Sequence, residues 1–270
     1  GAADSLASKL RSGLGFGVMQ SIGMKAVGTV TGALGGMVSG VIDAGKTFDA
    51  SMSQVAATMG KSVSEIQDLR DFAQEMGATT AFSATQAADA LNYRALAGYD
   101  SEKSMAMLPN VLNLASAGGM DLARASDMVT DAQSALGITM DETTTMVDQM
   151  ARTASKSNTS VEQLGDAILT IGATARSIKG GTTELNTILG ALADNGIKGA
   201  EGGTHLRNIL LALQNPTSDA AASLKKLGVS VYDADGNMRS TIDIIGDLQR
   251  GMEGMDQASK DAIISGIFNK

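Results

Sequence analysis

Three acidic and amide residues near the C-terminus have the spacing of a calcium-binding loop. Asp233, Asp235 and Asn237 alternate as ligands do in the first half of such a loop. The loop also needs glycine at its sixth position and a carboxylate at its twelfth, where this chain has Met238 and Ile244. A tight turn explains the same residues without an ion. We therefore predict no metal here.

Residues 196–204 (GIKGAEGGT) superficially resemble a phosphate-binding loop. No Lys precedes Thr204, and a predicted helix stands where that motif needs a strand. We interpret the stretch as a flexible connector that caps the following helix.

The single histidine, His205, follows directly and has no second His or Cys to share a ligand role. The paired carboxylates Asp141 and Glu142 fit the first turn of a helix, where the helix dipole favours negative charge. We predict no catalytic residue, no cofactor and no metal, and hence no enzyme.

Composition excludes further classes of function. The net charge of −8, with Lys225–Lys226 as the only adjacent basic pair, argues against a nucleic-acid-binding surface. The absence of Cys excludes disulfides. Aromatic residues make up only 3% of the chain, so its contacts must rely on small aliphatic side chains and Met. We expect extended helix-to-helix contact, including contact between copies of the chain.

A glycine stripe marks the N-terminal region. Gly28, Gly32, Gly36 and Gly40 recur every four residues, within 17 residues (26–42) that carry no charge. In a helix they would form one face on which a second helix could pack very closely. Three alternatives remain open: packing against copies of this helix or another component, insertion into lipid, or a segment that is only partly helical.

A second pattern follows the stripe. Phe48, Met52, Val55 and Met59 keep a four–three–four spacing, which is typical of a helical seam. We predict that these residues form a seam between copies of the chain.

Helix starts and stops recur from residue 62 onward. An N-cap Ser or Thr is followed three residues later by Glu or Gln, the pattern of a capping box, at Ser62–Glu65, Ser83–Gln86, Thr139–Glu142 and Ser160–Gln163. Glycine stops are predicted at Gly77, Gly98, Gly118–Gly119, Gly137 and Gly180–Gly181. Pro109 lies inside one helical pattern, where we expect a kink or a break.

One segment departs from the helical pattern. Short extended runs flank Asp235–Gly236, which predicts a β-hairpin over residues 229–240. The sequence thus predicts an all-α multi-helix assembly of short capped helices, with a long Gly-rich N-terminal helix and one small hairpin. We expect three regions: an N-terminal contact helix at 1–60, a helical core at 61–228, and the hairpin with C-terminal helices at 229–270.

Five segments in order resemble the core domain of phage tail tape measure proteins. They are Phe82–Gly98, Leu108–Gly119, Ser157–Ala175, Leu189–Pro216 and Leu227–Leu248. The resemblance covers about residues 48–252. It implies a structural virion protein of the tail, in the tube lumen or at the tail tip, which sets tail length, templates tube assembly and assists DNA ejection. It also implies a homo-oligomer, a trimer or hexamer, that contacts the tail tube protein, the distal tail or baseplate hub proteins and the tail assembly chaperones.

Chain length departs from the family. Even as one continuous helix, 270 residues would reach only about 400 Å at 1.5 Å per residue. We therefore expect a segment anchored at the tail tip, made in the host cytoplasm, and Gly1 in place of an initiator Met favours a processed or partial chain. The alternative is a membrane-inserting, pore-forming protein that delivers the genome through the host envelope. Contact with the host membrane is compatible with either function.

Overall fold

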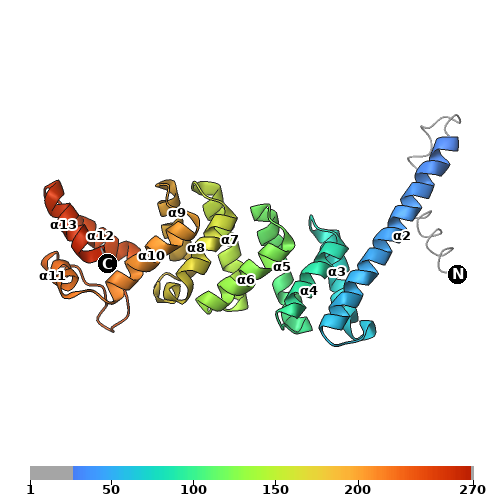
Figure 1. The fold of residues 1–270 in the computed structure, drawn as a ribbon, viewed down its shortest axis with the longest axis horizontal. Coiled ribbons are helices and arrows are strands. Elements are labelled where there is room, and N and C mark those ends of the chain that lie inside the picture. Colours follow the sequence, from blue (N-terminus) through green and yellow to red (C-terminus); the bar gives the residue numbers. More distant parts are fainter. Residues whose placement is uncertain (1–26, 269–270) are drawn as a thin grey trace. The chain divides into compact units, whose positions relative to one another are not determined.

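The computed structural model describes residues 27–268, and side-chain surroundings from residue 43 onward. Within that part of the chain all regular structure is helical, which confirms the predicted all-α class. The described residues include two 3-10 helices, η1 (Val63–Ile66) and η2 (Gly172–Ser177). The α-helices in Figure 1 are α2 (Val27–Thr58), α3 (Gln67–Thr79), α4 (Ala84–Leu96), α5 (Ser101–Gly118), α6 (Leu122–Leu136), α7 (Met140–Lys156), α8 (Val161–Ile171), α9 (Gly181–Asp194), α10 (Gly199–Gln214), α11 (Ser218–Lys226), α12 (Thr241–Gly251) and α13 (Gln257–Phe268).

Reciprocal capping bonds start three of these helices as predicted. At α7, the backbone N–H of Glu142 donates to Thr139 Oγ1 (3.3 Å), and the backbone N–H of Thr139 donates to Glu142 Oε2 (2.7 Å). Ser83 with Gln86 and Ser160 with Gln163 form the same pair of bonds at α4 and α8. These bonds satisfy backbone donors that the first turn of a helix leaves unpaired.

The fourth predicted capping pair differs from the other three. The backbone N–H of Ser62 donates to Glu65 Oε2 at 2.8 Å, but the N–H of Glu65 donates to the backbone carbonyl of Ser62. The element that starts there is the short η1 rather than an α-helix. A 3-10 turn therefore forms where the Ser hydroxyl is not the acceptor.

Glycine ends α5 and α6 as predicted, but not α3. Gly119 and Gly137 adopt left-handed backbone conformations (φ 62° and 66°) that L-residues disfavour. Gly77 instead lies inside α3, which continues to Thr79. A Cβ at Gly77 would lie 2.4 Å from the backbone nitrogen of Ala84, so this glycine permits close approach of the next helix start.

The chain divides into an N-terminal unit, residues 1–50, and a C-terminal unit, residues 51–270. The division falls within α2. The predicted stripe residues Gly28, Gly32, Gly36 and Gly40 belong to the N-terminal unit, and their surroundings lie outside the described side chains. Their packing role therefore stays a prediction.

Helices of the C-terminal unit pack mainly on near neighbours in chain order. Besides the next helix, each packs on the second one along: α4 on α6, α5 on α7, α6 on α8, α7 on α9 and α8 on α10. The last of these pairs has the most extensive contact. Such one-dimensional packing is typical of repeat architectures, in which each element is stabilised by its neighbours.

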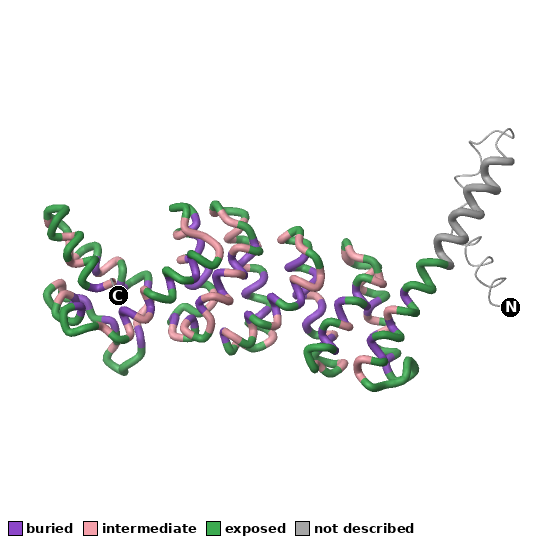
Figure 2. Tube along the Cα trace, viewed as in Figure 1, coloured by how far each residue is buried: buried purple, intermediate pink, exposed green. Residues whose placement is uncertain are grey.

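Aliphatic side chains and methionines build the core of the C-terminal unit. Figure 2 shows buried and exposed stretches alternating along its helices. Met107, Met128, Met146 and Met150 are almost fully buried, and no aromatic side chain between residues 51 and 268 is buried. Methionine suits such a core because its flexible thioether fills irregular gaps.

The expected break at Pro109 was wrong, and a kink there stays a prediction. Helix α5 runs unbroken through Pro109, and Leu108, Val111 and Leu112 around it are almost fully buried. Packing of these side chains outweighs the one backbone hydrogen bond that proline removes.

The predicted β-hairpin over residues 229–240 is also not formed. The segment contains a single antiparallel bridge, between Tyr232 and Met238. The amide of Val229 donates to the carbonyl of Leu224 at the end of α11, at 2.9 Å. Two backbone bonds do cross the segment, from the Asp233 N–H to the Asn237 carbonyl and from the Arg239 N–H to the Val231 carbonyl, both at 2.9 Å. The Asn237 N–H donates to the Asp233 side chain instead of returning a backbone bond, so pairing stays at one bridge.

Candidate helix-packing site

The most extensive helix contact in the C-terminal unit, between α8 and α10, includes Gly203 of α10. A Cβ built there would lie 2.4 Å from the carbonyl oxygen of Ala167 and 2.8 Å from Cβ of Thr170, both on α8. Any side chain larger than hydrogen would push the two helices apart. We expected residues 196–204 to be a flexible connector, but α10 begins at Gly199 and Gly203 is buried inside it. Gly203 is therefore a helical residue and part of the contact surface with α8.

The same device recurs between other alternate helices. A Cβ at Gly165 of α8 would meet the sulfur of Met128 on α6 at 2.0 Å. A Cβ at Gly190 of α9 would meet Ser157 Oγ, next to the end of α7, at 2.8 Å. Only Gly203 faces backbone atoms of the other helix, whereas Gly165 and Gly190 make room for side chains of the facing helix. All three lie inside helices, where glycine is disfavoured, and this signal was available in the sequence.

Polar side chains connect the same alternate helices. Arg124 of α6 pairs with Asp166 and, at 3.6 Å, with Glu162, both on α8. Gln149 of α7 donates to Thr183 Oγ1 of α9 at 2.6 Å. These bonds lie near the helix surface, where each adds modestly to stability and fixes the register of the packed pair.

Arg94 of α4 is the buried member of this series. Its guanidinium donates to the carbonyl of Ser126 on α6 at 2.9 Å and to the hydroxyl of Thr130. The Tyr99 ring centroid lies 5.8 Å from the guanidinium carbon. Burial lowers the pKa of Arg94 to about 10, and the charges of Tyr99 and Asp127 act in the opposite direction. The Nε of Arg94 is buried without a hydrogen-bond partner, and this unpaired donor costs folding free energy.

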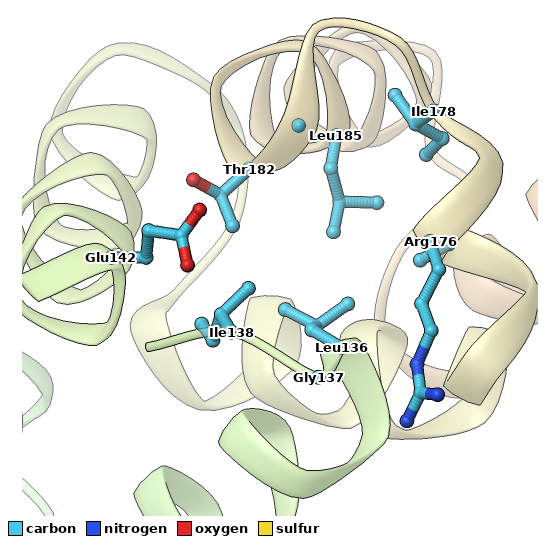
Figure 3. Close-up of a pocket in the computed structure, with 10 residues that line it drawn as sticks. Leu136, Gly137, Ile138, Glu142, Arg176, Ile178, Thr182 and Leu185 are labelled. Carbon is cyan, nitrogen blue, oxygen red and sulfur yellow. The ribbon is translucent and has the colours of Figure 1, made fainter. Parts of the chain in front are cut away.

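Figure 3 shows a cavity of about 350 Å³ between the end of α6, η2 and the start of α9. Leu136, Ile138 and Leu185 form its apolar wall, and Glu142 lies at one side. The guanidinium of Arg176 is engaged in the fold. It donates to the carbonyls of Ala135 and Ser134 at the end of α6 (2.9 and 2.8 Å). The Glu142 carboxylate is engaged in the cap of α7. The cavity walls therefore combine aliphatic side chains with the polar groups of Glu142, Thr182 and Arg176.

The residues first considered for chemistry all serve local structure. Asp233 accepts the amides of Asp235 (3.1 Å) and Asn237 (2.9 Å) and pairs with Lys179 at 3.0 Å, and the hydrogen bond from Lys179 is the main cause of its lowered pKa. His205 is half-exposed on α10, with Glu201 at 3.8 Å. Within the described residues, no group of three or more His, Asp or Glu could hold a metal ion.

The predicted seam residues are largely covered within the single chain. Met52 and Val55 are fully buried, Phe48 is 6% exposed and Met59 is half-buried. Thr58, beside them, donates to Asn92 of α4 at 2.7 Å. The sequence thus located an apolar seam whose inner residues already belong to the core. Its role between copies stays a prediction.

Comparison with known proteins places these helices in a family. Residues 70–269 match the family described as "Phage-related minor tail protein". The chain is 32% identical over 252 residues to the "Tape measure protein" of Pneumococcus phage Dp-1. This alignment covers 93% of this chain and 22% of the Dp-1 protein. The chain is 31% identical over 241 residues to the "Probable tape measure protein" of Escherichia phage P2, in an alignment that covers 88% of this chain and 29% of that protein. No solved structure shows significant similarity to it. The chain, which spans less than a third of the length of these relatives, belongs to the phage-related minor tail protein family, among tape measure proteins.

Proposed function

We propose that this chain is a folded segment of a tail tape measure protein, anchored at the tail tip within the tube lumen. The observation that carries the proposal is the ordered similarity over 93% of the chain to a protein named for that function. In this role the protein sets tail length, templates tube assembly and assists DNA ejection. The alternate-helix packing supports a structural role, because its polar side chains serve helix ends and helix contacts.

The measuring region lies outside these residues. The C-terminal unit is folded into short helices of at most 18 residues between residues 67 and 268, so it cannot act as an extended ruler in this state. An extended helix elsewhere would measure about 1.5 Å per residue. The relatives, of which this chain spans 22% and 29%, have room for such a region.

Gene deletion in the parent phage or prophage tests the proposal. Removing residues 70–269 is expected to abolish tails of defined length, since the anchor for tube assembly is lost. Removing 100 residues from an extended helical region of the full protein is expected to shorten the tail by about 150 Å and keep it uniform. Normal tails in the first strain, observed by electron microscopy, would refute the proposal.

We propose that copies associate as a trimer or hexamer and contact tail tube, hub and chaperone proteins. Exposed apolar side chains on the C-terminal unit support such contacts: Leu96 is 67% exposed and Tyr93, one turn earlier, is 38% exposed. Light scattering of the purified chain at micromolar concentration tests association. A monomer at all concentrations would contradict it.

A membrane-inserting function is supported only by the uncharged stretch at residues 26–42. Among the described residues, no helix has the length and apolar character that crossing a bilayer requires. Leakage of liposomes by a peptide of residues 13–46 tests this function, with Gly32→Leu and Gly36→Leu as the matched variant. If glycine packing forms a pore, the variant loses leakage; equal leakage removes the stripe from the mechanism.

A further inference from the structure

Residues 229–251, which we call the flap, form a loop whose two ends meet. A Cβ at Gly251 would lie 3.0 Å from both Cβ and the carbonyl oxygen of Leu227. Gly228 and Gly254 flank the flap with left-handed backbone (φ 69° and 77°) and have open space around them. Because its ends are already adjacent, the flap can leave its place without separating α11 from α13, which pack on each other.

The flap is held together by its own contacts. Tyr232 and Met238 form the antiparallel bridge. Arg239 pairs with Asp247 of α12 at 2.8 Å and donates to the carbonyl of Ser230, also at 2.8 Å. These bonds tie the turn to α12, so the turn and the helix would move as one body.

One buried carboxylate attaches this body to α9. Glu184 is 6% exposed, and its Oε1 accepts the hydroxyl of Ser240 (2.9 Å) and the backbone N–H of Ile242 (3.1 Å) at the start of α12. Its Oε2 accepts the backbone N–H of Gly180 at 2.8 Å. A Cβ at Gly180 would lie 2.6 Å from Cβ of Glu184, so glycine there makes room for the carboxylate.

A further hydrogen bond ties the flap to α10, where the Tyr232 hydroxyl donates to the carbonyl of Gln214 at 3.1 Å. Thr241 Oγ1 on α12 is buried without a hydrogen-bond partner, which disfavours the closed state. The Lys179–Asp233 pair is half-exposed on its lysine side. Ile244 and Leu248 supply the buried apolar contact of α12.

We propose that Glu184 is a latch that holds residues 229–251 on α9, and that the flap opens as one unit while α8 and α10 stay packed. Opening exposes the apolar face of α12 that carries Ile244 and Leu248. This inference rests on contacts inside the chain and does not depend on the tail assignment.

Hydrogen exchange followed by mass spectrometry of the full 270-residue chain tests the latch. Glu184→Gln leaves one acceptor oxygen, so the side chain can no longer accept from Gly180 on one side and from Ser240 and Ile242 on the other at the same time. The amides of α12 are expected to exchange about tenfold faster or more. Gly180→Ala should do the same by displacing the carboxylate. The matched control Glu201→Gln, on the exposed face of α10, should change nothing in the flap.

Two outcomes would overturn the proposal. Unchanged exchange in α12 of both variants would show that Glu184 does not hold the flap. Equal acceleration in α8 and α10 would show general support of the fold instead of local opening.

Thiol labelling gives an independent readout, because the natural chain has no Cys. Leu248→Cys places a thiol on the buried face of the flap, and this thiol should label about tenfold faster when Leu248→Cys is combined with Glu184→Gln. Leu210→Cys in the core of α10 should label at the same slow rate with and without Glu184→Gln. An equal labelling rate at position 248 with and without Glu184→Gln would contradict the latch.

Discussion

Gly203→Ala tests whether the α8–α10 contact is set by the absence of a side chain. Replacing glycine by alanine inside a helix ordinarily stabilises a protein by about 0.5–1 kcal/mol, because alanine has the higher helix propensity. At Gly203 the added Cβ would lie 2.4 Å from the carbonyl oxygen and 2.9 Å from Cα of Ala167. These are backbone atoms of another helix, and they cannot rotate away.

The magnitude follows from the balance of these two effects. Overpacking of a tightly packed core costs about 1–3 kcal/mol, and relief at Gly203 requires shifting whole helices. Subtracting the propensity gain leaves an expected net loss of up to about 2.5 kcal/mol, and of about 1.3 kcal/mol at the middle of both ranges. For a chain of this size the middle value lowers Tm by about 2.5–5 °C.

Urea denaturation followed by circular dichroism measures this change. Gly246→Ala in α12 is the matched control, because the nearest atom to its added Cβ is the flexible Arg250 Nη1 at 3.5 Å. The control should be more stable than the parent by about 0.5–1 kcal/mol, so the two variants should move in opposite directions. A Gly203→Ala protein as stable as the control would refute the claim that this glycine sets the helix separation.

Further substitutions separate other contributions to the fold. Gly165→Ala should cost less than about 1 kcal/mol, as judged by urea midpoints, because its Cβ would meet the side chain of Met128, which can change rotamer. Thr139→Ala should cost about 1 kcal/mol and Ser62→Ala clearly less, since only the first hydroxyl accepts a capping N–H; equal losses in the same assay would contradict this. Glu142 has a lowered pKa because it accepts the backbone N–H and the hydroxyl of Thr139, so its stabilisation is complete above the unfolded pKa of about 4.3 and is lost as pH falls through the lower folded value. Glu142→Gln should keep the cap and flatten the fall in stability below about pH 4.5; equal slopes in urea titrations from pH 7 to 3.5 would show that this carboxylate is not responsible.

Local signals predicted most of the helices. Capping boxes at Ser83, Thr139 and Ser160 started α-helices where expected, because the bonds involved join residues three apart and need no tertiary partner. Ser62 shows the limit of that reasoning, since only the acid side of its box formed. Errors arose where a distant contact decided the outcome, as at Pro109, whose neighbours are held by packing.

Among the candidate site residues, Met52 and Val55 were predicted to form a seam between copies of the chain, and this role stays a prediction. Sequence spacing shows that such residues share a face, but it does not show which surface covers them. The structure places both in the core of the single chain. The Gly28–Gly40 stripe remains a sequence-based prediction.

By itself, the sequence determined the all-α class, the starts of several helices and the family, because caps, apolar spacing and ordered motifs are properties of neighbouring residues. Only the tertiary structure decided which glycines lie at helix contacts and which polar side chains connect one helix to another. Gly203 has the same local propensity as a connector glycine, and Glu184 resembles any helical glutamate. Their roles come from Ala167 and Ser240, which lie far away in the chain and are brought close only by packing.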